Sequence, residues 1–156
     1  MPRFVIQQHA ATSLHFDFRL EVDGSYKSWA VPKGPSIDPR EKRLAMAVED
    51  HELSWGDFEG VIEEGYGAGR VIVWDHGRYR NLRDEPMSEG LQAGHVAFWL
   101  EGEKLRGGWS LRHTGERRWL LVKRRDDEAD AHRNPVSTQR ESVLSGRTIE
   151  DLEREQ

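Results

Sequence analysis

Short stretches of alternating apolar and polar residues run along most of the chain, separated by turns that contain Gly or Pro. This alternation indicates strands, because successive side chains of a strand point to opposite faces. Strands are expected over Phe4–Gln7, Leu14–Val22, Ser28–Val31, Leu44–Val48, Arg70–Trp74, Val96–Leu100, Gly108–Arg112 and Trp119–Lys123. Turns are expected at Asp23-Gly24, Pro32–Pro35, Gly65–Gly69, His76-Gly77 and Thr114-Gly115. Few stretches show a helical period, so the pattern predicts an all-β barrel or sandwich with one or two short helices.

The composition excludes several classes of protein. The 156 residues fit one domain of the usual size, about 100–200 residues. The chain has no Cys, which excludes a disulfide framework, thiolate zinc sites and a catalytic thiol. The longest apolar run, Val96–Leu100, is far too short for a transmembrane helix, and no hydrophobic signal region precedes the first strand. We therefore expect a cytoplasmic protein with no membrane partner.

Charge is distributed unevenly and divides the chain near residue 125. Residues 126–156 carry four Arg against nine Asp or Glu and few large apolar residues. We expect residues 1–125 to form the folded domain and residues 126–156 an acidic, flexible tail, in which Thr148–Asp151 has the pattern of a helix-opening capping box. Residues 103–125 carry eight Lys or Arg against two Glu, and such a basic block can bind a polyanion. Residues 38–64 carry three against nine, and such an acidic block can help hold a divalent cation.

The segment from His9 to Glu21 contains the most informative pattern. Strand alternation places an apolar set on one face, namely Leu14, Phe16, Phe18 and Leu20, and a polar set on the other, namely His15, Asp17, Arg19 and Glu21. His15 and Asp17 could bind one cation, with His9 reaching it across a short loop, because imidazole and carboxylate suit Mn²⁺-like or Fe²⁺-like metals. Arg19 could hold a phosphate oxygen beside the metal. An amphipathic strand with a solvated polar face gives the same spacing, so both interpretations stay open.

A second segment, Arg43–His51, has a similar alternation. Leu44, Met46 and Val48 fall on one side, whereas Arg43, Ala45, Ala47, Glu49 and His51 fall on the other. The two alanines leave room for a ligand over the strand, and His51 could donate a hydrogen bond to phosphate or protonate a leaving group. An edge strand whose His51 begins a turn is the alternative.

Two other features have simpler explanations. Gly65–Gly69 resembles a phosphate-binding loop, but a strand follows it and not the helix that such a loop needs, so we expect a hairpin turn. The six Trp are spaced like barrel core and rim residues, with base stacking possible for one or two.

Longer motifs follow one another along the chain. The first are Gln7-x-His9-x-Ala11, Leu14–Glu21 and Ser28–Pro35. Shorter ones lie at Lys42–Ala45, Glu49–His51, Phe58–Gly60, Tyr66–Gly69, Trp74-Asp75, Leu105–Gly107, Trp119–Lys123 and Ser145–Thr148. Together they resemble the 3′-phosphoesterase domain of bacterial DNA ligase D over nearly the whole chain.

This resemblance implies a compact antiparallel β-barrel enzyme that trims DNA 3′ ends during end joining. The family removes a 3′-terminal ribonucleoside and then the remaining 3′-phosphate, with a divalent metal that is typically Mn²⁺. Carried over by position, the metal ligands are His9, His15 and Asp17, and the residues on the phosphate are Arg19 and His51, with Lys33 and Arg43 adding positive charge and Gln7 a supporting hydrogen bond. The implied partners are DNA 3′ ends, a DNA ligase or polymerase and an end-binding protein, in the cytoplasm near the nucleoid.

Two departures from the family pattern bear on substrate choice. Trp55 stands where the family usually has Tyr, so a phenolic hydroxyl is lost. The family also carries a charged N-terminal arm that assists ribonucleoside removal, and Met1 lies just before the first strand. We therefore expect a competent 3′-phosphatase and a slower 3′-ribonuclease.

Two other functions fit parts of the same pattern. His15-x-Asp17 with a distant His is also the ligand set of non-haem Fe(II) oxygenases. Arg19, Lys33 and Arg43 nearby suit phosphate better than dioxygen. A non-catalytic module that docks on DNA ends or on a repair protein would keep the basic block without needing His9, His15 or Asp17.

Overall fold

The computed structural model describes residues 1–65 and 68–155. Its strands are β1 (Arg3–Ala10), β2 (Leu14–Val22), β3 (Ser25–Val31), β4 (Arg43–His51), β5 (Gly60–Ile62), β6 (Gly69–Asn81), β7 (His95–Gly102), β8 (Arg106–Gly115) and β9 (Arg118–Lys123). Every expected strand is present, and most extend further than the alternation alone indicates. Only the short β5 has no counterpart among the expected strands.

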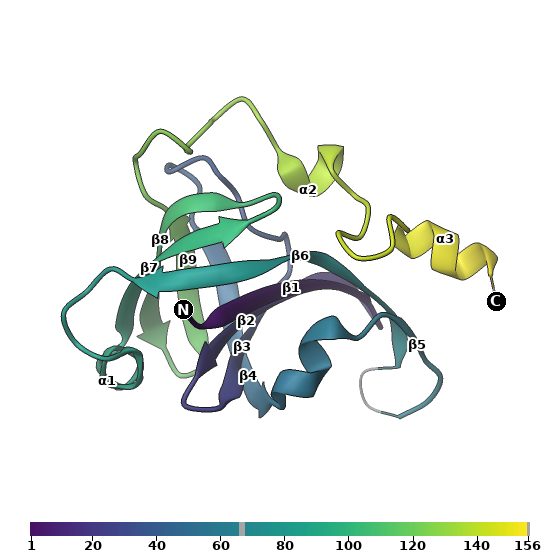
Figure 1. The fold of residues 1–156 in the computed structure, drawn as a ribbon, viewed down its shortest axis with the longest axis horizontal. Helices are drawn as coiled ribbons and strands as arrows, with labels where there is room; N and C mark the ends of the chain where they lie inside the picture. The colour runs from purple at the N-terminus through teal and green to yellow at the C-terminus, as the bar shows by residue number, and fades with distance from the viewer. Residues whose placement is uncertain (66–67, 156) are drawn as a thin grey trace.

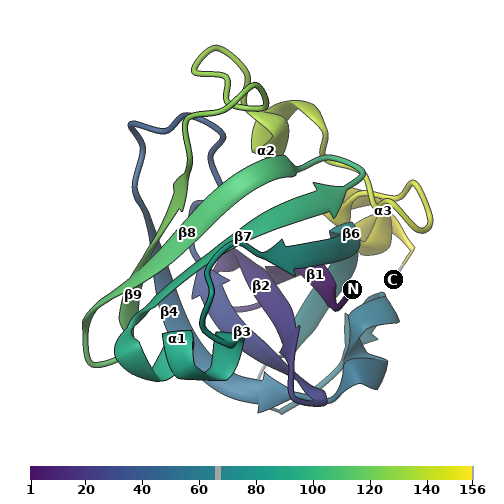
Figure 2. The same ribbon diagram turned by 60° about the vertical axis from the view of Figure 1, so that its left-hand side comes forward.

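The strands form one antiparallel sheet that closes on itself. Within the described residues, the sheet order is β1-β2-β3-β4-β9-β8-β7-β6-β5, and β1 also pairs with β6. That pairing closes eight strands into a barrel, with β5 as an extra strand beside β6 (Figures 1 and 2). The structure thus confirms the all-β fold and the antiparallel barrel.

The barrel interior is filled by one side of each strand. On β2, Phe16, Phe18 and Leu20 are buried in the core, as the alternation predicts. Leu14 belongs to the same set but is 53% exposed, so this end of the apolar face does not contribute to the core. Leu14 is the first residue of β2, and its pair with Ala10 is the last one before the hairpin loop.

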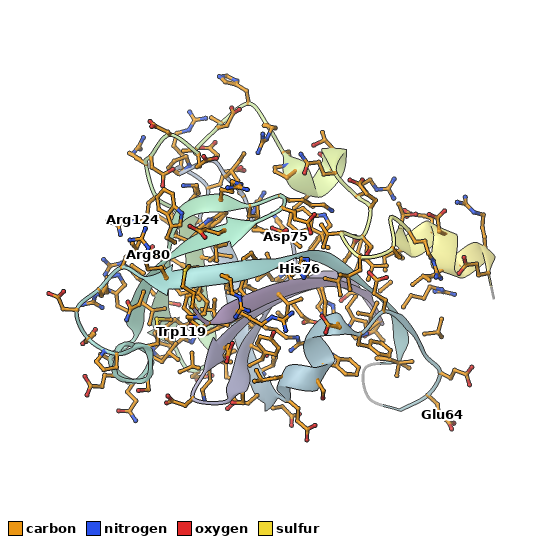
Figure 3. All side chains as sticks on the ribbon, viewed as in Figure 1. Glu64, Asp75, His76, Arg80, Trp119 and Arg124 are labelled. Carbon is orange, nitrogen blue, oxygen red and sulfur yellow. The ribbon has the colours of Figure 1, made fainter. Side chains whose placement is uncertain are left out.

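The expectation of a turn at His76-Gly77 is wrong, because β6 continues through both residues. Gly77 pairs with Gly102 of β7, and a Cβ on Gly77 would lie 2.0 Å from the carbonyl oxygen of Glu101. The glycine is needed for close approach of two backbones and not for a reversal of the chain. Asp75 and His76 lie side by side along this strand (Figure 3). The turn expected over Gly65–Gly69 includes Tyr66 and Gly67, which lie outside the described residues, but β5 and β6 on either side pair antiparallel.

The helices are short, as expected. They are the 3-10 helix η1 (Leu53–Asp57) and the α-helices α1 (Met87–Ala93), α2 (Pro135–Thr138) and α3 (Ile149–Arg154). The capping box before α3 is confirmed: the Thr148 hydroxyl accepts from the Asp151 N–H, and the Asp151 carboxylate accepts from the Thr148 N–H. Among the described residues, no helix has the length and apolar character needed to cross a membrane.

The C-terminal segment contacts the barrel at several points. Ile149 and Leu152 of α3 are buried against Ile72 of β6. The indole N–H of Trp74 donates to the Gln139 carbonyl over 2.7 Å, and the buried Lys104 ammonium donates to the carbonyls of Gln139 and Glu141. Burial lowers the pKa of Lys104 to about 8. The division into a domain of residues 1–125 and a flexible tail of residues 126–156 stays a prediction, and these contacts argue that removing the tail would expose core side chains.

Substitution of Leu152 by Ala is expected to lower the free energy of unfolding by about 2 kcal/mol or more, because it removes buried methyl groups from the contact with β6. Leu144→Ala is the matched control, since Leu144 lies in the same segment with its side chain 45% exposed, and its effect is expected to be within about 0.5 kcal/mol. Urea unfolding of both variants measures the difference. Equal stability of the two variants would show that α3 does not contribute to the fold.

Candidate metal centre and anion site

The polar residues of the first hairpin lie on the outer face of the barrel, opposite to the core side of β2. The register pairs His9 of β1 directly with His15 of β2, and Gln7 with Asp17. His9 Nδ1 lies 3.5 Å from one carboxylate oxygen of Asp17, and His15 Nε2 lies 3.2 Å from the other. The imidazole rings of His9 and His15 are 4.9 Å apart. The structure therefore brings together the three residues expected to bind a metal, by cross-strand pairing.

The donor atoms of this cluster suit a cation. One ligand atom from each of His9, His15 and Asp17 lies within 4.8 Å of the others. The Nδ1 of His15 is 3.2 Å from the Ser13 carbonyl oxygen, and when it donates there the lone pair of Nε2 faces the Asp17 carboxylate. Two acceptors facing each other require a proton or a metal ion between them. Two imidazoles and one carboxylate match the preferences of Mn²⁺, Fe²⁺ or Zn²⁺.

Electrostatics keep the carboxylate ionised. Burial by itself would raise the pKa of Asp17, but hydrogen bonds from His15 and His9 and the charge of Arg19 outweigh it, and the pKa lies well below its usual range. The hydrogen bond with Asp17 raises the pKa of His15. Both shifts describe a cluster that already favours positive charge at its centre.

Arg19 lies next to this cluster with its guanidinium almost completely buried. Its Nε donates to Gln7 Oε1 over 2.8 Å, and its Nη1 donates to Ser28 Oγ over 2.8 Å. Nη1 also lies 2.9 Å from His51 Nδ1, and Nη2 lies 3.5 Å from an Asp17 oxygen. The guanidinium thus connects Asp17 of the candidate metal cluster to side chains from β1, β3 and β4.

His51 reaches Arg19 because β4 contains a β-bulge. Tyr26 pairs with His51 but Ser28 pairs with Val48, so two steps along β3 correspond to three steps along β4. The extra residue reverses the alternation and places His51 on the outer face with Arg19. The expectation that Arg43, Ala45, Ala47, Glu49 and His51 share one face was therefore wrong. Ala45 is buried in the core and leaves no room for a ligand, whereas Ala47 is only partly buried against the core and lines a pocket.

Two contacts of His51 Nδ1 bear on the charge of its ring. Nδ1 lies 2.9 Å from Arg19 Nη1, which can only donate, and 3.0 Å from the Glu49 carbonyl oxygen, which can only accept. Burial, together with the positive charge of Arg19, lowers the pKa of His51. The lowered pKa favours the neutral ring, in which Nδ1 accepts from Arg19 and Nε2–H is the donor.

Gln7 links the guanidinium to the segment after β4. It is fully buried, and its Nε2 donates to the carbonyl oxygens of Trp55 and Phe58, at 2.9 and 3.3 Å. Its predicted supporting role corresponds to this bridge, because its Oε1 accepts from Arg19. Sequence reasoning did not find Ser28 as an Arg19 partner, although cross-strand pairing of β2 with β3 places it directly opposite.

Lys33 and Arg43 are less closely connected with the cluster. Lys33 lies exposed in the turn after β3. Arg43 pairs with Leu121 at the start of β4 and its side chain is 3.8 Å from the Glu41 carboxylate. Alternation puts Arg43 on the side of Ala45, opposite to the face of Asp17. Their contribution of positive charge at the site stays a prediction.

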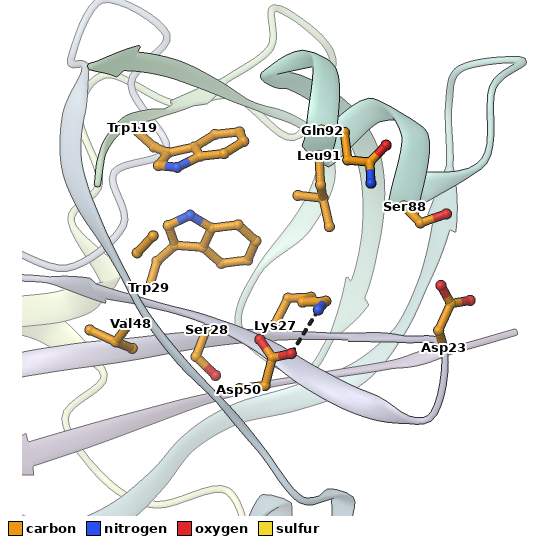
Figure 4. A pocket seen from close by; sticks show the side chains of 11 residues that line it. Asp23, Lys27, Ser28, Trp29, Val48, Asp50, Ser88, Leu91, Gln92 and Trp119 are labelled. Carbon is orange, nitrogen blue, oxygen red and sulfur yellow. Dashed lines mark hydrogen bonds and ion pairs between the residues drawn. The ribbon is translucent and has the colours of Figure 1, made fainter. Parts of the chain in front are cut away.

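A pocket of the described chain lies elsewhere. It has a volume of about 450 Å³ and lies between α1 and the β3–β4 end of the barrel, next to the indoles of Trp29 and Trp119 (Figure 4). Lys27 and Asp50 form an ion pair of 2.7 Å at its rim. Ser28 lines it as well as contacting Arg19, but the pocket contains no member of the His9, His15 and Asp17 cluster.

The chain is similar to known proteins over most of its length. Residues 7–113 match the family described as the DNA Ligase D 3′-phosphoesterase domain. The chain is 54% identical over 154 residues to the Multifunctional non-homologous end joining protein LigD of Pseudomonas aeruginosa, covering 94% of this chain and 18% of that protein. It is 44% identical over 120 residues to the Multifunctional non-homologous end joining DNA repair protein LigD of Mycobacterium tuberculosis, covering 75% and 15%.

The Multifunctional non-homologous end joining protein LigD of Mycolicibacterium smegmatis is 38% identical over 131 residues, covering 81% of this chain and 17% of that protein. The chain thus spans less than a fifth of the length of these relatives. All of the cluster residues lie inside the matched range, residues 7–113. On these matches, the chain belongs to the DNA ligase D 3′-phosphoesterase domain family.

Proposed function

We propose that this chain hydrolyses 3′-phosphomonoesters at DNA ends, with Mn²⁺ or another divalent cation held by His9, His15 and Asp17. The observation that carries the proposal is the convergence of these ligand atoms beside a buried guanidinium. A cation held there would act as a Lewis acid on a phosphoryl oxygen. The same site would favour a dianionic phosphate, because Arg19 and the His51 Nε2–H offer donors on its other side.

Within this proposal, Arg19 and His51 stabilise charge as it develops on the phosphoryl oxygens. The guanidinium is held before substrate arrives by Gln7 and Ser28, so little reorganisation is needed during the reaction. A neutral His51 is a hydrogen-bond donor to phosphate and a poor general acid. The assignment of His51 as the group that protonates the leaving oxygen is therefore not part of the proposal.

The proposed partners are DNA 3′ ends and, within end joining, a DNA ligase or polymerase and an end-binding protein. The relatives carry non-homologous end joining in their names, and the matched region is one part of those longer proteins. A basic block at residues 103–125 provides positive charge for the DNA backbone. Arg124 of this block and Arg80 of β6 lie at the opposite end of the molecule from Glu64 (Figure 3). This role implies a cytoplasmic location near the nucleoid.

Asp17→Asn is expected to abolish release of inorganic phosphate from a 3′-phosphorylated oligonucleotide, because it removes a charged ligand from the cluster. The loss should exceed the roughly 10–100-fold that loss of an outer-shell partner costs. Asp50→Asn is the matched control, since Asp50 is an exposed carboxylate outside the cluster that pairs with Lys27. Phosphate release with Mn²⁺, with EDTA and without oxygen measures the effect.

The outcome separates the candidate functions. Phosphate release that needs Mn²⁺ and Asp17 but no oxygen supports the proposal and excludes the non-haem Fe(II) oxygenase. A protein that releases no phosphate, and whose affinity for 3′ ends is unchanged by the Asp17→Asn substitution, would be a docking module.

The pKa of His51 is expected to lie below the ordinary value of about 6.5. The ring should therefore become half-protonated only at a pH below 6.5. An NMR titration of the His51 ring protons measures it. In Arg19→Gln, loss of the neighbouring positive charge should raise the midpoint toward 6.5. A wild-type midpoint above 6.5 would instead make His51 the proton donor to the leaving group.

Removal of a 3′-terminal ribonucleoside is the second activity in the proposal, at a lower rate. A phosphodiester with its neighbouring 2′-hydroxyl must be placed in line, and misplacement on the order of 1 Å can cost about 10²-fold. Trp55 supplies no phenolic hydroxyl at the position where the family pattern has Tyr. Two primer-templates that differ only at the 3′ end, one with a phosphate and one with a ribonucleotide, test this. Equal rates on both would contradict it.

A further inference from the structure

Two aromatic rings stack on each other beside the proposed reaction site. The rings of Trp55 and Phe58 lie parallel, with centroids 4.4 Å apart and an interplanar angle of 9°. Both side chains are half-buried, whereas Trp29, Trp74, Trp109 and Trp119 are buried in the fold. Core packing therefore does not account for this pair, which presents part of its aromatic surface to solvent.

The pair is held rigidly with respect to Arg19. Helix η1 sits on Tyr26 through Gly56, where a Cβ would approach the Tyr26 hydroxyl to 2.8 Å, so only glycine allows this contact. The carbonyl oxygens of Trp55 and Phe58 both accept from Gln7, which also accepts from Arg19. One buried side chain thus joins the guanidinium to the backbone that carries the stacked rings.

The surroundings of the pair decide which part of a DNA end it can bind. Apart from His51, which belongs to the proposed phosphate site, the segment of residues 38–64 carries three Lys or Arg against nine Asp or Glu, and this net negative charge disfavours further phosphate contacts. An uncharged nucleobase is the part of a nucleotide that gains from contact with an aromatic surface in such a field. The Trp55 ring is 6.0 Å from the His51 ring, so a nucleotide whose 3′-phosphate reaches His51 brings its own base to the pair.

We propose that the stacked rings of Trp55 and Phe58 bind the terminal nucleobase of the DNA 3′ end. The inference rests on the proposed function, because it places the 3′-phosphate at Arg19 and His51. Stacking uses no base-specific donors or acceptors, so the site accepts any base. Its contribution to binding is also independent of salt, unlike that of phosphate contacts.

The test compares two labelled primer-templates that end in a 3′-phosphate, one with an intact terminal nucleotide and one with an abasic terminal nucleotide. Affinities are measured by fluorescence anisotropy in EDTA, which prevents metal-dependent turnover. Trp55→Ala and the abasic end should each weaken binding by about 5- to 150-fold, the range for one stacked base. The two changes together should weaken binding no more than either alone. The loss in Trp55→Ala should be equal at low and high salt.

Matched variants separate the stacking site from a general effect on the fold. Trp55→Phe and Trp55→Tyr keep an aromatic ring and should retain most of the affinity. Trp99→Ala removes the other half-exposed indole, which lies on β7 beside Arg80, and should keep the preference for the intact end. Quenching of tryptophan fluorescence by the intact end should be lost in Trp55→Phe and kept in Trp99→Phe.

Equal affinities for the intact and abasic ends, including a failure to bind either, would overturn the proposal. So would an additive loss when Trp55→Ala is combined with the abasic end. Phosphate release by the wild-type protein is assayed separately with Mn²⁺. If release occurs while the base makes no difference, the proposed function stands and the stacking site does not.

Discussion

The burial of one positive charge, the guanidinium of Arg19, determines how this site is built. A charge on the outside of a barrel strand would normally stay in water, and its removal from water costs several kcal/mol unless it is paired and hydrogen-bonded. Here the partners come from β1, β2, β3 and β4, namely Gln7, Asp17, Ser28 and His51. Each strand must present its residue at the right register for the charge to be tolerated. The same registers place His9 and His15 of the candidate metal cluster opposite each other.

Most of the barrel and half of this site could be predicted from the period-two pattern. The alternation in β2 separates Phe16, Phe18 and Leu20 from His15, Asp17 and Arg19, and the core of the structure follows that division. Cross-strand pairing then needs only the short hairpin to bring His9 opposite His15. Local spacing sufficed here because both strands of the hairpin are adjacent in sequence, so their register is set by the loop length.

The remaining features depend on contacts between distant strands. His51 joins the site through a bulge whose position is defined by pairing with β3, and strict alternation assigns it to the wrong face. Gly77 was predicted to lie in a turn, but it is a strand residue whose missing Cβ allows the backbone of Glu101 to approach closely. Residues 126–156 were expected to form a tail because the segment is acidic and has few large apolar residues. Two of those residues, Ile149 and Leu152, nevertheless pack against Ile72 of β6. The sequence pattern shows the local periodicity of a strand, but it does not show which distant strand pairs with it or in which register.

The wall of the site that carries Trp55 and Phe58 depends on contacts from both sides. From inside, Gln7 holds the carbonyls of both residues. From outside, the carboxylate of Glu59 accepts from the Val73 N–H at 2.8 Å and from the Ser142 hydroxyl, which ties the residue after Phe58 to β6 and to the C-terminal segment. Val143 donates to the Val73 carbonyl at the same place. The C-terminal segment lies beyond the matched family range, yet these hydrogen bonds connect it through Glu59 and the adjacent Phe58 to Gln7, the side chain that accepts from Arg19.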